Sequence, residues 1–100
     1  MLSVYVKYSD ISNQGNDFDG YVGNHIPFVR EKLVGEGLLE IHVEASDSYP
    51  ENGSLIQAVM IFDSAESFET CMQSHGNVLA ADASKYVTAE PEILVAKRLS

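Results

Sequence analysis

The stretch from Leu55 to Phe62, Leu55-Ile-Gln-Ala-Val-Met-Ile-Phe62, is apolar at every position but one. A short run of this kind predicts a strand that is buried on both faces, because a strand with one wet face alternates polar and apolar residues. The fold must therefore cover both faces of the sheet that contains this strand.

Three other segments favour strands, namely residues 2–9, 38–46 and 93–99. Residues 2–9 alternate with period two and are rich in β-formers. In the second segment, one face is expected to carry Leu39, Ile41, Val43 and Ala45, and the other Leu38, Glu40, His42 and Glu44. Turn chemistry at residues 13–16 and a polar loop at 47–54, with Pro50, Asn52 and Gly53, separate the elements.

A first helix is expected after Asp17, which is a suitable N-cap, and it should stop at Gly35 and Gly37. The apolar residues recur every three or four positions. Its predicted inner stripe is Phe18, Tyr21, Val22, His25, Val29 and Leu33.

A second helix is expected to begin at a cap provided by Asp63 or Ser64, and Asp63 and Glu66 have capping-box spacing. Its inner stripe would be Phe68, Cys71 and Met72. We expect His75-Gly76-Asn77 to interrupt it and a second helical piece to cover about residues 78–86.

The element order β-α-β-β-α-β predicts one α+β domain over residues 1–100, a ferredoxin-like sandwich with an antiparallel four-stranded sheet and two helices on one face. The outer sheet face looks too apolar to lie open to water. Its predicted members are Tyr5, Lys7, Leu38, Glu40, His42, Val59, Ile61, Leu94, Ala96 and Arg98. We therefore expect a homodimer that closes a dimeric α/β barrel, the alternative being a monomer with a half-wet sheet.

Fifteen acidic against six basic residues give a formal charge of −9, which disfavours nucleic acids and anionic membranes as partners. No apolar run is long enough for a membrane helix, and the first residues do not resemble a signal peptide. Cys71 is the only cysteine, and its place on an apolar stripe predicts an inert buried thiol. A reducing, cytoplasmic location is the simplest expectation.

The group Tyr21-x-x-x-His25-x-Pro27 is the first candidate for chemistry. Tyr21 and His25 share a helix face, and Pro27 should kink the helix near Gly23. A desolvated imidazole beside a phenol can act as an acid or base, although a core histidine bonded to a freed carbonyl is an alternative. Further along the chain, Asp82 could orient an imidazole or could be solvated.

A second histidine, His42, lies between Glu40 and Glu44 with Lys7 and Arg98 as possible neighbours. Either a second acid–base cluster or ion pairing across the sheet or dimer interface would fit. Residues 25, 42 and 75 lack metal-ligand spacing, and no phosphate-binding or dinucleotide motif is present, so we expect neither a metal nor a nucleotide cofactor.

The run Phe18-Asp-Gly-Tyr21-Val-Gly-Asn-His25-Ile-Pro27 resembles the His-x-Pro helix of the EthD family of dimeric α/β-barrel proteins. Similar agreement extends over Ile61–Phe68, Val78–Asp82 with Tyr86, and Glu92–Lys97. Val22 and Phe28 stand where the family often has an aromatic residue and a leucine, which implies a reshaped pocket.

The resemblance implies a ferredoxin-like homodimer with a role in catabolism, as in ether degradation, or in polyketide-type metabolism. A cofactor-independent enzyme with oxidoreductase, isomerase or cyclase chemistry on a hydrophobic oxygenated molecule would fit. His25 would be catalytic, with Tyr21 and Asp82 assisting. Ligand-binding residues would be Phe18, Phe28, Met60, Phe62 and Tyr86. The alternatives are a non-catalytic binding or accessory protein for an oxygenase system and a purely structural domain.

Overall fold

The computed structural model describes residues 1–9, 15–51 and 53–100. The elements are β1 (Leu2–Tyr8), α1 (Phe18–Gly20), the π-helical turn η1 (Tyr21–His25), α2 (Ile26–Leu33), β2 (Leu38–Ala45), β3 (Ile56–Phe62), α3 (Ala65–Ala83) and β4 (Glu92–Lys97). Asn13 and Gln14 of the predicted turn and Asn52 of the predicted loop lie outside the described residues.

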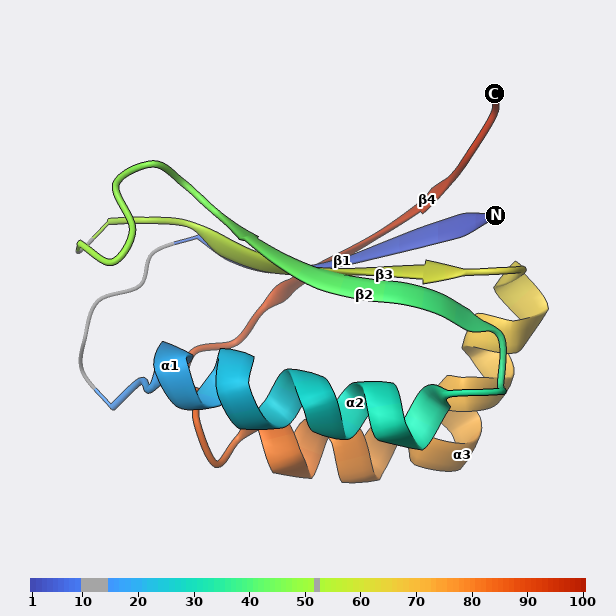
Figure 1. The fold of residues 1–100 in the computed structure, drawn as a ribbon, viewed down its shortest axis with the longest axis horizontal. Coiled ribbons are helices and arrows are strands. Elements are labelled where there is room, and N and C mark those ends of the chain that lie inside the picture. Colours follow the sequence, from blue (N-terminus) through green and yellow to red (C-terminus); the bar gives the residue numbers. More distant parts are fainter. Residues whose placement is uncertain (10–14, 52) are drawn as a thin grey trace.

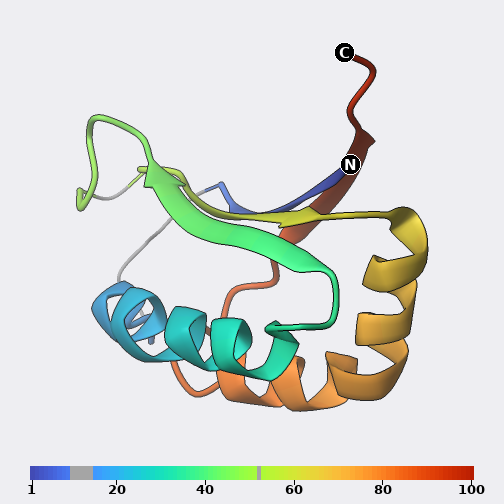
Figure 2. The same cartoon turned by 45° about the vertical axis from the view of Figure 1, so that its right-hand side comes forward.

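The four strands form one antiparallel sheet in the order β2-β3-β1-β4. All the helices lie on one side of this sheet, as Figures 1 and 2 show. The predicted α+β ferredoxin-like fold is therefore confirmed.

Strand β3 occupies an interior place in the sheet and is the most buried of the four strands. Its helix-facing residues, which join the main hydrophobic core, are Ile56, Ala58, Met60 and Phe62. On the opposite face Val59 is only 4% exposed, because neighbouring side chains on β1 and β2 shield it. The prediction of a strand buried on both faces is thus met fully on the inner face and, on the outer face, at Val59, whereas Gln57 and Ile61 are half-buried.

An irregularity at the start of β2 changes the predicted faces of that strand. Leu38 lies opposite Phe62 and packs against the core, and the register shifts between Leu38 and Glu40. Leu39 is 58% exposed. A bulge adds an unpaired residue and reverses the facing of residues on its far side, so the assignment of Leu38 to the outer face and Leu39 to the inner face is wrong. Residues 40–45 keep their predicted faces.

The first helical segment contains a π turn in place of a simple kink. The N–H of Ile26 donates to the carbonyl of Tyr21, five residues back, and Pro27 has no N–H to continue an α-helical pattern. A π turn holds more residues than an α turn, so Val22 rotates outward to 41% exposure and Ile26 is buried. The placement of Val22 on the inner stripe is wrong, whereas the other five members are buried.

Helix α3 is continuous, so the predicted interruption at His75-Gly76-Asn77 is wrong. A glycine within a helix costs about 1 kcal/mol relative to alanine, and the helix gains more from the core packing of Cys71 and Leu79. The hydroxyl of Ser64 accepts a hydrogen bond from the N–H of Ser67, so Ser64 is the cap and the Asp63–Glu66 capping box does not form.

Strand β4 is the least covered part of the sheet. Ile93, Leu94 and Val95 are 54%, 58% and 46% exposed, although they alternate between the two faces. The layer of helices therefore does not extend over β4, and this edge strand is exposed on both faces. Within the described ranges, none of the helices has the length and apolar character needed to span a bilayer.

Candidate active site

The fold brings His25 and Asp82 together from opposite ends of the chain. His25 is the last residue of the π turn, and Asp82 lies in the last turn of α3. The Nδ1 atom of His25 is 2.8 Å from Oδ2 of Asp82, and the two side chains are only 7% and 10% exposed. Asp82 thus contacts an imidazole, one of the two possibilities that the sequence left open.

The carboxylate of Asp82 fixes which nitrogen of the His25 ring carries a proton in the neutral form. Burial alone would raise the pKa of Asp82, but hydrogen bonds from His25 and Lys85 outweigh this effect, and the pKa lies below its ordinary value. The Nζ atom of Lys85 is 3.2 Å from the other carboxylate oxygen. An ionised carboxylate accepts hydrogen bonds only, so Nδ1 carries the proton and Nε2 of a neutral His25 is the basic nitrogen.

Two tyrosines lie beside this pair. The ring of Tyr21 is 5.0 Å from that of His25, between centroids, and it meets the ring of Tyr8 edge-on at 5.6 Å. Burial raises the pKa of Tyr21, and the neighbouring Tyr8 raises it further through charge and a hydrogen bond. Burial also raises the pKa of Tyr8. Both phenols therefore keep their protons at neutral pH and can donate hydrogen bonds.

Tyr8 was not among the predicted site residues. The signal for it was the alternation of residues 2–9, which places Tyr8 on the same face as Leu2 and Val4. Sequence alternation locates a face, but it does not indicate which member of that face meets a cavity.

An apolar cavity of about 210 Å³ adjoins His25. Its wall is built from the sheet, from both helical segments and from the residues before β4. Three polar side chains contribute to the wall, those of Tyr8, Tyr21 and His25. The rest of the lining is Val6, Ile26, Val29, Ile41, Ala58, Met60, Met72, Gly76, Leu79, Ala80, Ala83, Pro91 and Ile93.

The predicted ligand-binding residues are not all at this cavity. Met60 lines it. Phe18 meets Tyr8 and Tyr21 edge-on in the core, and Phe62 packs against Phe68. Phe28 lies half-buried on α2 beneath the ammonium group of Lys32.

Tyr86 lies just beyond α3 and belongs to the packing that holds the start of the first helical segment. Its carbonyl accepts a hydrogen bond from the N–H of Asp17. Its ring closely approaches Gly20, where an added Cβ would be 2.8 Å away.

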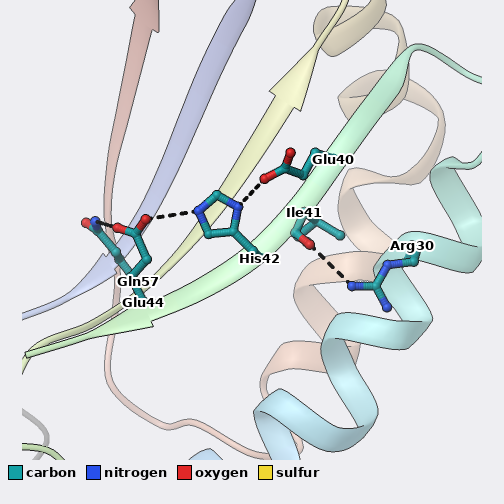
Figure 3. Close-up of polar contacts among 6 residues, drawn as sticks. All are labelled: Arg30, Glu40, Ile41, His42, Glu44 and Gln57. Atoms are coloured by element: carbon teal, nitrogen blue, oxygen red, sulfur yellow. Dashed lines mark hydrogen bonds and ion pairs between the residues drawn. The ribbon is translucent and has the colours of Figure 1, made fainter.

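His42 forms a second cluster on the outer sheet face, shown in Figure 3. Its Nδ1 is 2.6 Å from Glu40 and its Nε2 is 3.0 Å from Glu44, whose other oxygen accepts from Gln57. The hydrogen bond to Glu44 is the main cause of a raised pKa for His42. Among the described residues, the ion pairs of His42 therefore run along β2, between residues two apart, and not across the sheet as predicted, where the side-chain hydrogen bond from Gln57 to Glu44 crosses to β3.

Cys71 and the other acidic and histidine side chains offer little alternative chemistry. Burial raises the pKa of the Cys71 thiol, as do the nearby Glu36 and Asp63, and its Sγ donates to the carbonyl of Glu36. In the parts of the chain that the structure describes, no three His, Cys, Asp or Glu side chains are placed to hold a metal ion.

Comparison with solved structures places the fold among EthD-like proteins. An EthD-like protein from Ralstonia eutropha JMP134 is 25% identical with a TM-score of 0.79, covering 99% of this chain and 92% of its own. An ethyl tert-butyl ether D (EthD) family protein from Bacillus halodurans C-125 is 20% identical with a TM-score of 0.74, and the match covers 99% of this chain and 100% of that protein. The resemblance to the EthD family is confirmed.

A more distant neighbour is a candidate antibiotic biosynthesis monooxygenase from Chloroflexus aurantiacus J-10-fl. It is 17% identical with a TM-score of 0.60, covering 99% of this chain and 93% of its own. No protein-family model and no curated protein sequence matches the chain. The neighbours indicate a small ferredoxin-like enzyme or binding protein.

Proposed function

We propose that this EthD-like chain is a small cofactor-independent enzyme in which His25 transfers a proton of a hydrophobic, oxygenated molecule. One observation carries the proposal: the His25 ring, held by Asp82 at 2.8 Å, lines an apolar cavity. An apolar pocket with a few convergent polar groups is the usual form of a small-molecule site. A buried histidine with a carboxylate behind it is a common general base.

The reaction begins with neutral His25. Its Nε2 takes a proton from an acidic O–H, or from a C–H next to a carbonyl, and the electron pair moves onto the substrate oxygen. The imidazolium that forms is stabilised by the carboxylate of Asp82. The hydroxyl of Tyr21, once it exchanges its hydrogen bond to Tyr8 for one to the substrate, would donate to the oxyanion. Return of the proton to a different carbon gives an isomer, and attack of the carbanion on a second carbonyl gives a cyclised product.

We also propose that residues 1–100 act as one domain and pair with a second copy through the outer sheet face. Val59 is already buried there, whereas Leu94 on the same face is 58% exposed. Packing of two such faces would remove the apolar surface of Leu94 from water. Sedimentation of the protein at micromolar concentration tests this pairing, and a monomer would contradict it.

The catalytic proposal is tested with the ketone 2-tetralone in heavy water, where NMR follows the loss of α-hydrogen signals. The protein should accelerate exchange, and His25→Ala should lower the rate by about 100-fold, the contribution typical of a general base. His75→Ala is the matched control. His75 also pairs with a carboxylate, that of Glu36 at 2.9 Å, but it does not line the cavity. Equal rates in His25→Ala and the wild type, with both folded, would refute the mechanism.

The second candidate function is ligand binding without catalysis, as in an accessory protein. The largely apolar wall of the cavity favours it, because such a wall binds a molecule without acting on it. In that case 2-tetralone would bind equally to the wild type and to His25→Ala, and neither would accelerate exchange.

A further inference from the structure

Building on the proposed active site, we propose that its cavity binds an uncharged molecule with a single ring or two fused rings and one hydroxyl or carbonyl group. The ligand enters between α3 and β4, and Gly76 sets the size that fits. The argument comes from the volume, the charge, the exposure gradient and the packing of the cavity wall.

The volume limits the size of the ligand. The cavity holds about 210 Å³. An apolar cavity of about 150 Å³ is enough for benzene, whereas drug-sized ligands use pockets of roughly 300 Å³ or more. A molecule with one or two fused rings falls between these limits.

The chemistry of the wall limits the charge of the ligand. Among the described residues that line the cavity there is no Lys, Arg, Asp or Glu. Asp82, the nearest carboxylate, is engaged by His25 and Lys85. A charged ligand would lose its hydration with no opposite charge to replace it. The polar groups available are a few hydrogen-bonding side chains around His25, enough for one hydroxyl or carbonyl oxygen.

The exposure of the wall shows where the cavity opens. Tyr21 and His25 are 2% and 6% exposed, and they mark the closed end. Ala80 on α3, together with Pro91 and Ile93 at the start of β4, is exposed to solvent. The entrance therefore lies between α3 and β4, and a ligand that enters there meets His25 at the far end.

Gly76 leaves space in the wall near this entrance. A Cβ added to Gly76 would lie 4.0 Å from Met72 Cβ, so it would meet no tight contact. Since alanine and larger residues favour a helix more than glycine does, a larger residue here would suit the helix and would take up room in the cavity. Gly76 thus has the properties of a residue that determines ligand size.

The experiment compares 2-naphthol, phenol and naphthalene-2-sulfonate as probes, with binding measured by calorimetry. The wild type should bind 2-naphthol and phenol, and the sulfonate should bind about tenfold more weakly than 2-naphthol or worse. Gly76→Leu should weaken the binding of 2-naphthol by about tenfold or more, while the affinity for phenol changes by less than about threefold. The affinity of Gly76→Ala for 2-naphthol should lie between those of the wild type and Gly76→Leu, and its Tm should be raised.

Asn77→Leu is the matched control, because Asn77 is the exposed neighbour of Gly76 on α3. It should leave the affinities for all three probes unchanged. The inference is overturned if Gly76→Leu weakens both neutral probes equally, if it weakens neither, or if the sulfonate binds as well as 2-naphthol. Circular dichroism of each variant confirms that the helix is intact.

The two proposals fail in different ways. In one outcome Gly76→Leu distinguishes the probes by size, but exchange of 2-tetralone does not depend on His25. This outcome would refute the catalytic role of His25 and leave the proposed ligand class intact. Exchange that depends on His25 without any effect of Gly76→Leu would refute the entrance and the size limit alone.

Discussion

All three histidines of the chain lie within 3.0 Å of a carboxylate, and two of them, His25 and His42, differ most in their surroundings. His25 meets Asp82 at 2.8 Å with side chains 7% and 10% exposed. His42 meets Glu40 at 2.6 Å and Glu44 at 3.0 Å with side chains 39%, 59% and 56% exposed. In the first pair one ring nitrogen is bonded, and in the second both are (Figure 3).

The difference teaches that a short hydrogen bond to a carboxylate does not by itself make a histidine reactive. A ring with a carboxylate at each nitrogen is favoured in its protonated form, as the raised pKa of His42 indicates, and both of its nitrogens are engaged. The ring of His25 keeps one nitrogen available and borders a cavity. Within one protomer, solvent also screens the His42 cluster, so its contacts contribute less energy than those of the buried pair.

The largest expected effect is on stability. Asp82→Ala removes one partner of a buried pair and should lower the free energy of unfolding by about 3 kcal/mol. Glu40→Ala, in the exposed cluster, should lower it by about 0.5 kcal/mol. Urea unfolding followed by circular dichroism measures both. Similar losses for the two variants would show that burial does not distinguish the clusters.

A conservative change at the same position should affect turnover more than folding. Asp82→Asn keeps the shape but can no longer hold the Nδ1 proton of His25 in the same way, so exchange of 2-tetralone should slow by about 10- to 100-fold. The KM should change little, because Asp82 does not line the cavity. Glu44→Gln serves as the control, and an equal slowing there would remove the functional distinction between the clusters.

The smallest effect separates the clusters by pH. The pKa of His42 is raised above its ordinary value of 6.5, so its stabilising contribution is complete below pH 6.5 and is lost as pH rises through the folded-state pKa. The difference in urea midpoint between wild type and His42→Gln should therefore be largest below pH 6.5 and should shrink as the pH rises above this value.

Asp82 should behave in the opposite sense. Its pKa is lowered from 3.8, so its contribution is present above pH 3.8 and is lost as pH falls through the lower folded-state value. The difference between wild type and Asp82→Asn should stay constant where the His42 difference changes. A change in both differences over the same range would mean that the two clusters are coupled.

Much of the fold could be predicted because strands and helices leave periodic patterns. The apolar run at residues 55–62 predicted the most buried strand, and Asp17 and Ser64 were found as possible caps. Two errors arose where a local preference met a stronger tertiary contact. The glycine at position 76 did not end α3, and a bulge exchanged the faces of Leu38 and Leu39.

The candidate site could be predicted only in part. His25 and Tyr21 were found because they share one helix face four residues apart. Asp82 is 57 residues from His25 in the sequence, so their contact depends on how the helices pack, which no local pattern encodes. A pocket was expected, but its volume and most of its lining could not be predicted, because they depend on how distant side chains pack and on where a small residue such as Gly76 leaves space.

The π turn makes the site depend on the number of residues in the first helical segment. The π turn already holds one residue more than an α turn, so inserting a further residue between Tyr21 and His25 would rotate everything before it by about 100° relative to α2. Tyr21 would then leave the ring of His25, even though every functional side chain remained in the sequence. Replacing the outward-facing Val22, by contrast, should be tolerated. Variation in length in this segment is therefore a more severe threat to the site than most changes of residue type.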